Sequence, residues 1–290
     1  MSVASVLASG EQIQSLTSGQ YSTVYNLLSL AIASLGFTAL FLVFSQNRVA
    51  PAYRHALVVS ATVCGIATYH YFRIFNNFKD SYPAGATTSS AHVLSNVAFN
   101  EAYRYVDWFL TVPLLLVETV AVMRLARPEA RGLLYRLVPA SALMIGLGYP
   151  GELSTDTGTR LIWGTLSTLP FIYLLYVLFV QLTASIERQP ANVRHTISML
   201  RVMLVGLWGV YPIAYLFPVF GGSFFGGAGG FVLRQVGYSL ADIFAKAAYG
   251  LVIYKIARRR SEADEPDVYG EESSAQPSTG RSPKPARAGR

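Results

Sequence analysis

Seven long apolar stretches restrict the fold of this chain more than any other feature. A helix needs about 20 mainly apolar residues to cross the hydrocarbon core of a membrane. The stretches are Val24–Phe44, Ala56–Phe72, Arg104–Arg124, Leu133–Gly148, Leu161–Ile186, Val202–Phe220 and Gln235–Tyr254. Only 13% of the 290 residues are charged, against about 25% in an average soluble protein. We therefore predict an all-α membrane protein, a seven-transmembrane-helix bundle, with a kink at Pro212 in the sixth helix.

The basic residues predict how the bundle is oriented. They gather in the connections after the first, third and fifth stretches and behind the seventh: Arg48, Arg54, Arg124, Arg127, Arg131, Arg188, Arg194, Lys255 and residues 258–260. The other connections hold fewer, namely Lys79, Arg160 and Arg234. The positive-inside rule then puts the N-terminus outside and the C-terminus in the cytoplasm, as expected for a bacterial plasma membrane protein. The net charge of +7 suits an anionic membrane face, and no nucleic-acid motif accounts for it instead.

Composition divides the chain into three parts. Residues 1–20 are polar, lack the features of a signal peptide, and are predicted to be an extracellular segment. Residues 21–260 form the helical domain, and residues 261–290, rich in Pro, Ser, Glu and Arg, are predicted to be a disordered cytoplasmic tail. Outside the membrane, Asn76–Ser95 has room for a short hairpin, and Gly221–Gly230 is predicted to be a flexible connection. Cys64 is the only cysteine, so an internal disulfide is excluded.

Lys246 stands inside the otherwise apolar seventh stretch. A lysine at this depth costs several kcal/mol unless a partner neutralises it, which makes it a candidate functional residue. Asp242 lies one helical turn earlier, on the same face. A buried amine suits a Schiff base with an aldehyde, whereas a purely structural ion pair of Asp242 with Lys246 is the alternative. These two residues alone leave both interpretations open.

The third stretch carries Asp107, Thr111 and Glu118 on one helical face. At about 100° per residue, Thr111 lies about 40° and Glu118 about 20° around the axis from Asp107. The two acids are about 16 Å apart along the axis, which suits proton transfer across the membrane. Pairing with arginine is the alternative, reasonable for Asp107 with Arg104 but poor for Glu118. Without a partner, Glu118 is expected to stay protonated at rest.

Together these helices resemble the microbial rhodopsins. The motifs Arg104-Tyr-Val-Asp107-Trp108 and Asp242-Ile-Phe-Ala-Lys246 are similar to the third and last helices of that family. Leu-Trp208-Gly-Val-Tyr211-Pro212-Ile-Ala-Tyr215 is similar to the sixth helix. The resemblance covers roughly residues 21–258 and implies all-trans retinal, bound to Lys246 as a protonated Schiff base.

The resemblance also implies a role for each matching residue. Asp107 would be the primary counterion and proton acceptor, Asp242 the second counterion, and Glu118 the cytoplasmic proton donor. His70, Arg104 and Thr111 would tune the counterion, His70 by stabilising ionised Asp107, although a lone histidine in an apolar helix more often serves packing. The retinal pocket would be lined by Trp108, Leu115, Trp208, Tyr211, Pro212 and Tyr215, with Leu115 favouring green absorption.

The combination of Asp107, Thr111 and Glu118 resembles outward proton pumps of the proteorhodopsin and xanthorhodopsin type. Residues 162–170 resemble the xanthorhodopsin subgroup, in which a glycine leaves an opening for a carotenoid antenna; Gly164 would be that glycine. Close helix packing is the alternative role of Gly164. A homo-oligomer, pentameric or similar, is implied by resemblance alone.

Other functions remain as alternatives to pumping. A sensory photoreceptor would signal through a transducer, and a seven-helix receptor would carry no chromophore. An enzyme is disfavoured, since neither a Ser-His-Asp nor a metal-binding constellation is evident in the sequence. No pair of outer glutamates is evident either, so the sequence does not identify a proton-release group.

Overall fold

The computed structural model describes residues 12–83, 87–88, 91–123 and 125–270, and within them the chain forms a bundle of long helices. The membrane-spanning helices are α2 (Ser18–Phe44), α3 (Pro51–Ser81), α4 (Ala102–Val122), α5 (Arg127–Leu153), α6 (Thr157–Ser185), α7 (Ala191–Trp208) continued by α8 (Val210–Tyr215), and α11 (Gly227–Asp242) continued by η3 (Ile243–Ala248) and α12 (Tyr249–Asp264). Short elements join them: η1 (Gln46–Arg48), η2 (Ile186–Arg188), α9 (Phe217–Phe220) and α10 (Gly222–Phe225).

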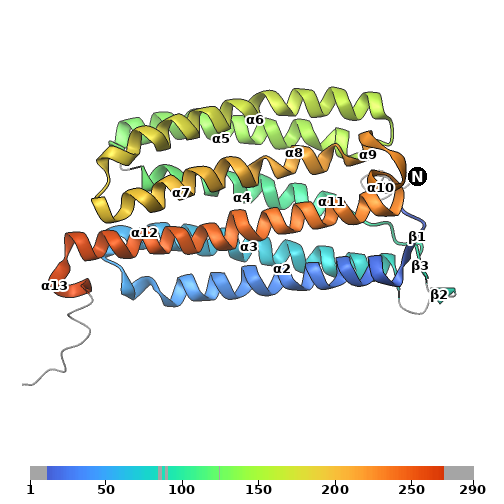
Figure 1. Ribbon diagram of the computed structural model, residues 1–290, viewed down its shortest axis with the longest axis horizontal. Helices are drawn as coiled ribbons and strands as arrows, with labels where there is room; N and C mark the ends of the chain where they lie inside the picture. Colours follow the sequence, from blue (N-terminus) through green and yellow to red (C-terminus); the bar gives the residue numbers. More distant parts are fainter. Residues whose placement is uncertain (1–11, 84–86, 89–90, 124, 271–290) are drawn as a thin grey trace, which may run out of the picture.

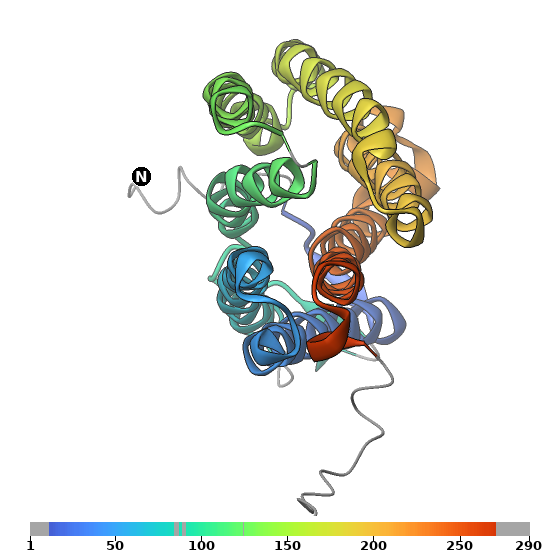
Figure 2. The same ribbon diagram turned by 90° about the vertical axis from the view of Figure 1, so that its left-hand side faces the viewer.

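The helices lie side by side and enclose a central axis (Figures 1 and 2). Each helix from α2 to α7 packs against the next one in the chain, α12 packs against α7, and α11 returns to α2. Polar groups that would be costly in lipid can therefore face the inside of this ring. The outside is apolar, with Phe37, Phe44 and Ile162 among the most exposed large side chains.

Six helical segments among the described residues are long and apolar enough to cross a membrane, and α3 makes a seventh helix of 31 residues. The helix α3 is less apolar because it also carries polar and charged residues, among them the buried Ser60 and His70 and several residues near its two ends. The predicted seven-helix architecture is therefore confirmed.

Several helix limits differ from the predicted ones. Helices extend beyond the apolar runs, and the last begins at Gly227, eight residues before the predicted start. The last helix can begin this early because the connection before it is compact. Gly221, Gly222 and Gly227 adopt positive φ angles there, which make tight turns in the predicted flexible connection. The sixth helix is interrupted at Gly209. Pro212 has no N–H to donate to the carbonyl one turn earlier, at Trp208, so the interruption falls just before the predicted kink.

A small antiparallel sheet lies at one end of the helical bundle. It consists of β1 (Ser15–Thr17), β2 (Thr87–Thr88) and β3 (Ala91–Val93), with β3 in the middle. Ser15 pairs with Val93 and Thr87 with His92, so the hairpin considered for this loop forms and also recruits the N-terminal strand. Thr17 then begins α2 through a capping box with Gln20.

The opposite end of the bundle is closed by the last helix. Arg260 is buried and donates hydrogen bonds to the Val122 carbonyl (2.6 Å) and to the Gln189 side chain. The helix α12 continues to Asp264 and is followed by α13 (Pro266–Tyr269), so the predicted disordered tail begins too early. Residues 1–11, 271–290 and Arg124 lie outside the described residues.

Candidate functional site

Lys246 lies at the centre of the bundle, between two carboxylates. Its side chain is about 1% exposed, and Nζ contacts Asp107 Oδ2 from α4 and Asp242 Oδ1 at 2.9 Å. Both carboxylates are also buried, so each charge depends on the others for compensation. Lys246 belongs to the π-helical segment η3, a widened turn of a kind often found at functional sites. The sequence predicted the three residues, but not this irregular turn.

Asp242 is fixed by hydrogen bonds from three helices. Tyr71 from α3 donates to Oδ2 (2.8 Å), Tyr211 from α8 donates to Oδ1 (2.7 Å), and the indole of Trp108 from α4 donates at 3.2 Å. These donors stabilise the ionised carboxylate beside Lys246. Trp108 and Tyr211 were predicted as pocket walls, and the structure adds a polar contact to each. Tyr71 was missed because its sequence neighbourhood singles out His70 instead.

A partly open cavity, with about 820 Å³ of empty space including its open side, has Lys246 among its lining residues. Every residue predicted for the pocket wall lines it: Trp108, Leu115, Trp208, Tyr211, Pro212 and Tyr215. Tyr105, Met144, Phe171 and Tyr238 line it as well and were not predicted. A mainly apolar wall with one amine at its end fits an apolar aldehyde joined to Lys246 Nζ.

Gly164 of α6 lies on the wall of this cavity and is partly exposed. A Cβ at this position would lie 2.6 Å from the ring of Tyr215, and one at Gly151 would lie 1.9 Å from the Tyr215 hydroxyl oxygen. Both glycines thus make room for Tyr215, which donates a hydrogen bond to the Arg160 carbonyl (2.8 Å). Close packing is therefore one role of Gly164, as the sequence alternative held.

Glu118 is buried on the same face of α4 as Asp107, one turn before Val122, whose carbonyl accepts a hydrogen bond from Arg260 of α12. Its carboxyl group accepts a hydrogen bond from Ser60 of α3. None of the ion pairs among the described residues includes Glu118. This agrees with a neutral carboxylic acid. The sequence analysis did not identify Ser60 as a partner of Glu118. Ser60 precedes Cys64 by four residues and Tyr71 by eleven, and this helical spacing puts all three residues on the inner face of α3.

The three residues expected to tune Asp107 make different contacts. Thr111 donates to the main-chain carbonyl of Asp107 (2.8 Å). His70 is buried, but its Nδ1 has no hydrogen-bond partner among the described residues, and the same holds for Asp107 Oδ1. Arg104 does not pair with Asp107 in the described structure, which corrects the alternative pairing. Its guanidinium donates instead to Tyr71 (2.9 Å) and Gln235 (2.6 Å).

Beyond Arg104, toward the sheet, lies an outer charge cluster that the sequence did not reveal. Its five buried members are Glu101, Arg104, Glu152, Arg160 and Arg234. Arg234 bridges the two glutamates at 3.2 Å each, so an outer glutamate pair is present after all. Arg160 and Arg234 were predicted as loop residues but lie within α6 and α11. Glu101 immediately precedes α4, Glu152 lies in α5, and the two are 51 residues apart, so no local pattern joins them.

The fold and this centre define a class: seven-helix membrane proteins with a buried lysine held by two carboxylates at the end of an apolar cavity. The family model of bacteriorhodopsin-like proteins matches residues 22–259. The chain therefore belongs to the bacteriorhodopsin-like family of microbial rhodopsins. As such it is a multi-pass membrane protein of the cell membrane that carries retinal, and it is not an enzyme.

Individual relatives agree with this assignment. Xanthorhodopsin, described as a light-driven ion pump with dual chromophore, is 46% identical with a TM-score of 0.80, covering 87% of this chain and 99% of that one. Green-light absorbing proteorhodopsin of Gamma-proteobacterium EBAC31A08 is 28% identical over 236 residues, 80% of this chain and 85% of the relative. Bacteriorhodopsin of Halobacterium salinarum is 32% identical over 177 residues, which span 61% of either chain.

Proposed function

We propose that this protein is a light-driven proton pump that moves protons outward, from the cytoplasm to the outside. One observation carries the proposal. Lys246 Nζ contacts buried Asp107, while Glu118 is buried on the same face of the same helix, toward the opposite side of the membrane. A proton can be taken from the amine on one side and returned from the other, which is the arrangement that directional transport needs.

The residues have distinct tasks in this proposal. Lys246 holds retinal as a protonated Schiff base, and retinal supplies the light-driven change that releases the proton at Nζ. Asp107 accepts this proton at its carboxylate, while Asp242 remains the second counterion. Glu118 then returns a proton to Nζ and is refilled from the cytoplasm. His70, Arg104 and Thr111 tune the acceptor, and the aromatic wall shapes the cavity.

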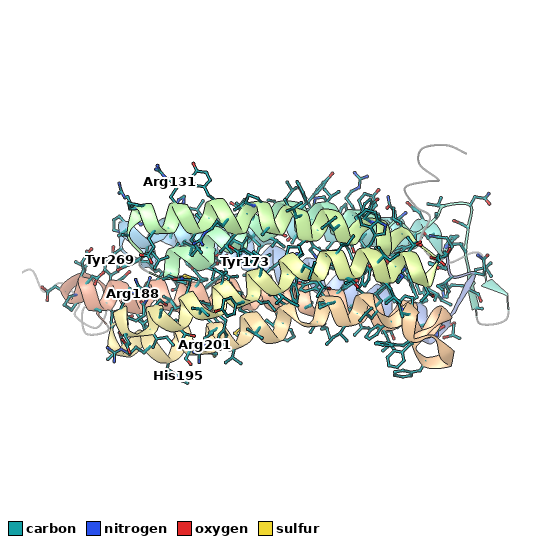
Figure 3. The ribbon with its side chains drawn as sticks, turned by 90° about the horizontal axis from the view of Figure 1, so that it is seen from above. Arg131, Tyr173, Arg188, His195, Arg201 and Tyr269 are labelled. Carbon is teal, nitrogen blue, oxygen red and sulfur yellow. The ribbon has the colours of Figure 1, made fainter. Side chains whose placement is uncertain are left out.

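The outward direction rests on the charge distribution. Figure 3 has Arg131 and Arg188 at the end of the bundle where Tyr269 of α13 lies, opposite the sheet. By the positive-inside rule, that end faces the cytoplasm and residues 1–20 lie outside. Asp107 is then on the outer side of Glu118.

The resemblance further suggests that the protein forms a pentamer or a similar ring. Native mass spectrometry in detergent tests this oligomeric state.

Illumination of cells that express the protein with added retinal tests the pump. Sustained acidification of the medium that a protonophore abolishes is the expected result. A steady external pH, with an intact visible absorption band, would favour the sensory alternative. Alkalinisation would instead reverse the proposed direction.

Replacing Glu118 with glutamine is expected to slow the return of the proton to Lys246 Nζ by about 100-fold at alkaline pH. Glutamine cannot donate a proton, and a positioned acid contributes about 10²–10⁴-fold to such a step. Flash photolysis measures the recovery. Glu129→Gln, at an exposed acid in the first turn of α5, is the matched control and should keep wild-type timing. Unchanged recovery in Glu118→Gln would refute the donor role.

A carotenoid antenna at Gly164 is the finer part of the proposal. Its support is the partly exposed glycine on the cavity wall and the similarity to xanthorhodopsin, which is described as having a dual chromophore. With a carotenoid added, wild type should transfer excitation energy to retinal, and Gly164→Trp should lose this transfer. The retinal band of Gly164→Trp has to be measured as well, because a side chain at this position displaces the Tyr215 ring. The control is Gly146→Trp on the exposed face of α5, where a Cβ meets nothing within 4 Å. Equal transfer in both variants would exclude the site.

A further inference from the structure

The outer charge cluster is the largest group of buried charges that the proposed transfer between Glu118, Lys246 and Asp107 does not use. It begins one helical turn beyond Asp107, at Arg104, and continues to Glu101. Arg104 Nε lies 3.6 Å from Glu101 Oε2. Gln235 connects the same two residues a second time, since it accepts from Arg104 (2.6 Å) and donates to Glu101 (2.7 Å). Glu101 is thus the first carboxylate that lies outward from Asp107 along α4.

The two glutamates of the cluster differ in how fully they are engaged. Glu152 is about 1% exposed, and its Oε2 accepts hydrogen bonds from Tyr105 (3.3 Å) and Tyr238 (3.1 Å). Its Oε1 accepts no hydrogen bond among the described residues, but it faces two cations, Arg234 at 3.2 Å and Arg160 at 3.8 Å. Because Tyr105 and Tyr238 line the cavity, Glu152 supports the retinal pocket. A proton bound to Glu152 would disturb several of these contacts at once.

Glu101 has one oxygen that faces a single cation. Its Oε1 accepts from Gln235 and Arg234, whereas Oε2 is buried, has no hydrogen-bond partner among the described residues and lies 3.6 Å from Arg104 Nε. Glu101 is about 6% exposed and precedes the first turn of α4. A proton on Glu101 Oε2 would weaken one ion pair, whereas a proton on Glu152 Oε1 would disturb two.

We propose that Glu101 is the exit group for the transported proton, and that Glu152 is a structural anchor. The inference rests on the proposed pumping function and adds its last step. Asp107 gives up its O–H proton and becomes a carboxylate again. Glu101 Oε2 binds that proton and later passes it to water outside. The two residues are about 9 Å apart along the helix axis, and the side chain of Arg104 lies between them.

The charges of the cluster decide when this happens. Three arginines face two glutamates, so three positive charges minus two negative charges leave a net charge of +1. A proton that enters the cluster adds to this excess of positive charge. In the proposed sequence Glu101 therefore receives its proton only from Asp107, after Asp107 has been protonated. Release should follow Asp107 deprotonation and not precede it.

Glu101→Gln in the full-length, retinal-loaded protein tests the exit role. Proton release to the medium, followed with a pH-sensitive dye after a flash, should be delayed about tenfold or more. The transfer from Lys246 to Asp107 and the visible absorption band should stay as in wild type. Infrared difference spectra should lose one transient carboxylic acid band. Glu101→Asp keeps an ionisable carboxyl group and should restore most of the release rate.

Two further variants separate the possible outcomes. Glu152→Gln should shift the absorption band or lower the melting temperature, yet keep release coupled to Asp107 deprotonation. Asp80→Asn, at an exposed acid near the same end, should behave as wild type. Wild-type release timing in Glu101→Gln, or a delay only in Glu152→Gln, would overturn the assignment. Failure of wild type to acidify the medium would instead refute the pump itself.

Discussion

Lys246→Ala is expected to leave the protein without a visible absorption band when retinal is supplied. Lys246 provides the only amine among the described residues that line the cavity, so the alanine variant has no nitrogen there for the imine. The loss should be complete because the change removes a covalent bond. Absorption spectra of the purified protein, recorded before and after the addition of hydroxylamine, measure the loss of the band.

The same substitution should also lower stability. It leaves Asp107 and Asp242 as buried carboxylates without their cation, and breaking a buried pair costs about 3–5 kcal/mol. Circular dichroism therefore has to establish that Lys246→Ala is folded. Lys79→Ala changes an exposed lysine near the end of α3 and is the control that should keep the colour. A coloured, hydroxylamine-sensitive Lys246→Ala protein would refute the attachment site.

Asp107→Asn is expected to abolish light-driven proton transport and to shift the absorption maximum to the red. Asparagine cannot take up the proton that Lys246 Nζ releases. It also removes one of the two negative charges that contact Nζ. A nearby negative charge stabilises the ground state, whose positive charge lies at the nitrogen, more than it stabilises the delocalised excited state. Its removal lowers the excitation energy.

Proteoliposomes that contain a pH indicator measure transport by Asp107→Asn, and a spectrum measures its colour. Asp242 remains to pair with Lys246, held by Tyr71, Tyr211 and Trp108, so this variant should fold and bind retinal. Asp80→Asn is again the control. Residual pumping above background would make Asp242 the acceptor, and an unchanged absorption maximum would argue against Asp107 as the primary counterion.

The central site could be predicted because its residues are close in the sequence within each helix, and because the resemblance to the microbial rhodopsins related the two helices to each other. Arg104, Asp107, Thr111, Leu115 and Glu118 recur at helical spacing, and all are buried on one face of α4. Asp242 and Lys246 are one turn apart, and they form the expected ion pair. The small sheet was harder to predict, since β1 and β3 are separated by more than 70 residues and each has only three residues.

The outer charge cluster illustrates what sequence reasoning could not reach. Arg160 and Arg234 were assigned to loops because a charge ends an apolar run. In the structure each lies inside a helix that continues past the run, where carboxylates from other helices compensate for its charge. The sequence did not indicate that Glu101 and Glu152 belong to one site. Only the structure shows that Arg234 pairs with both of them.

The sequence by itself determined the number of membrane-spanning helices, the buried face of the third helix and the residues that share one helix, because hydrophobicity and helical period are local properties. Only the tertiary structure decided that Tyr71 and Tyr211 hold Asp242, that Ser60 contacts Glu118, and that two glycines accommodate Tyr215. These contacts join different helices. Their geometry depends on how whole helices rotate and pack against each other, and no spacing along the chain encodes it.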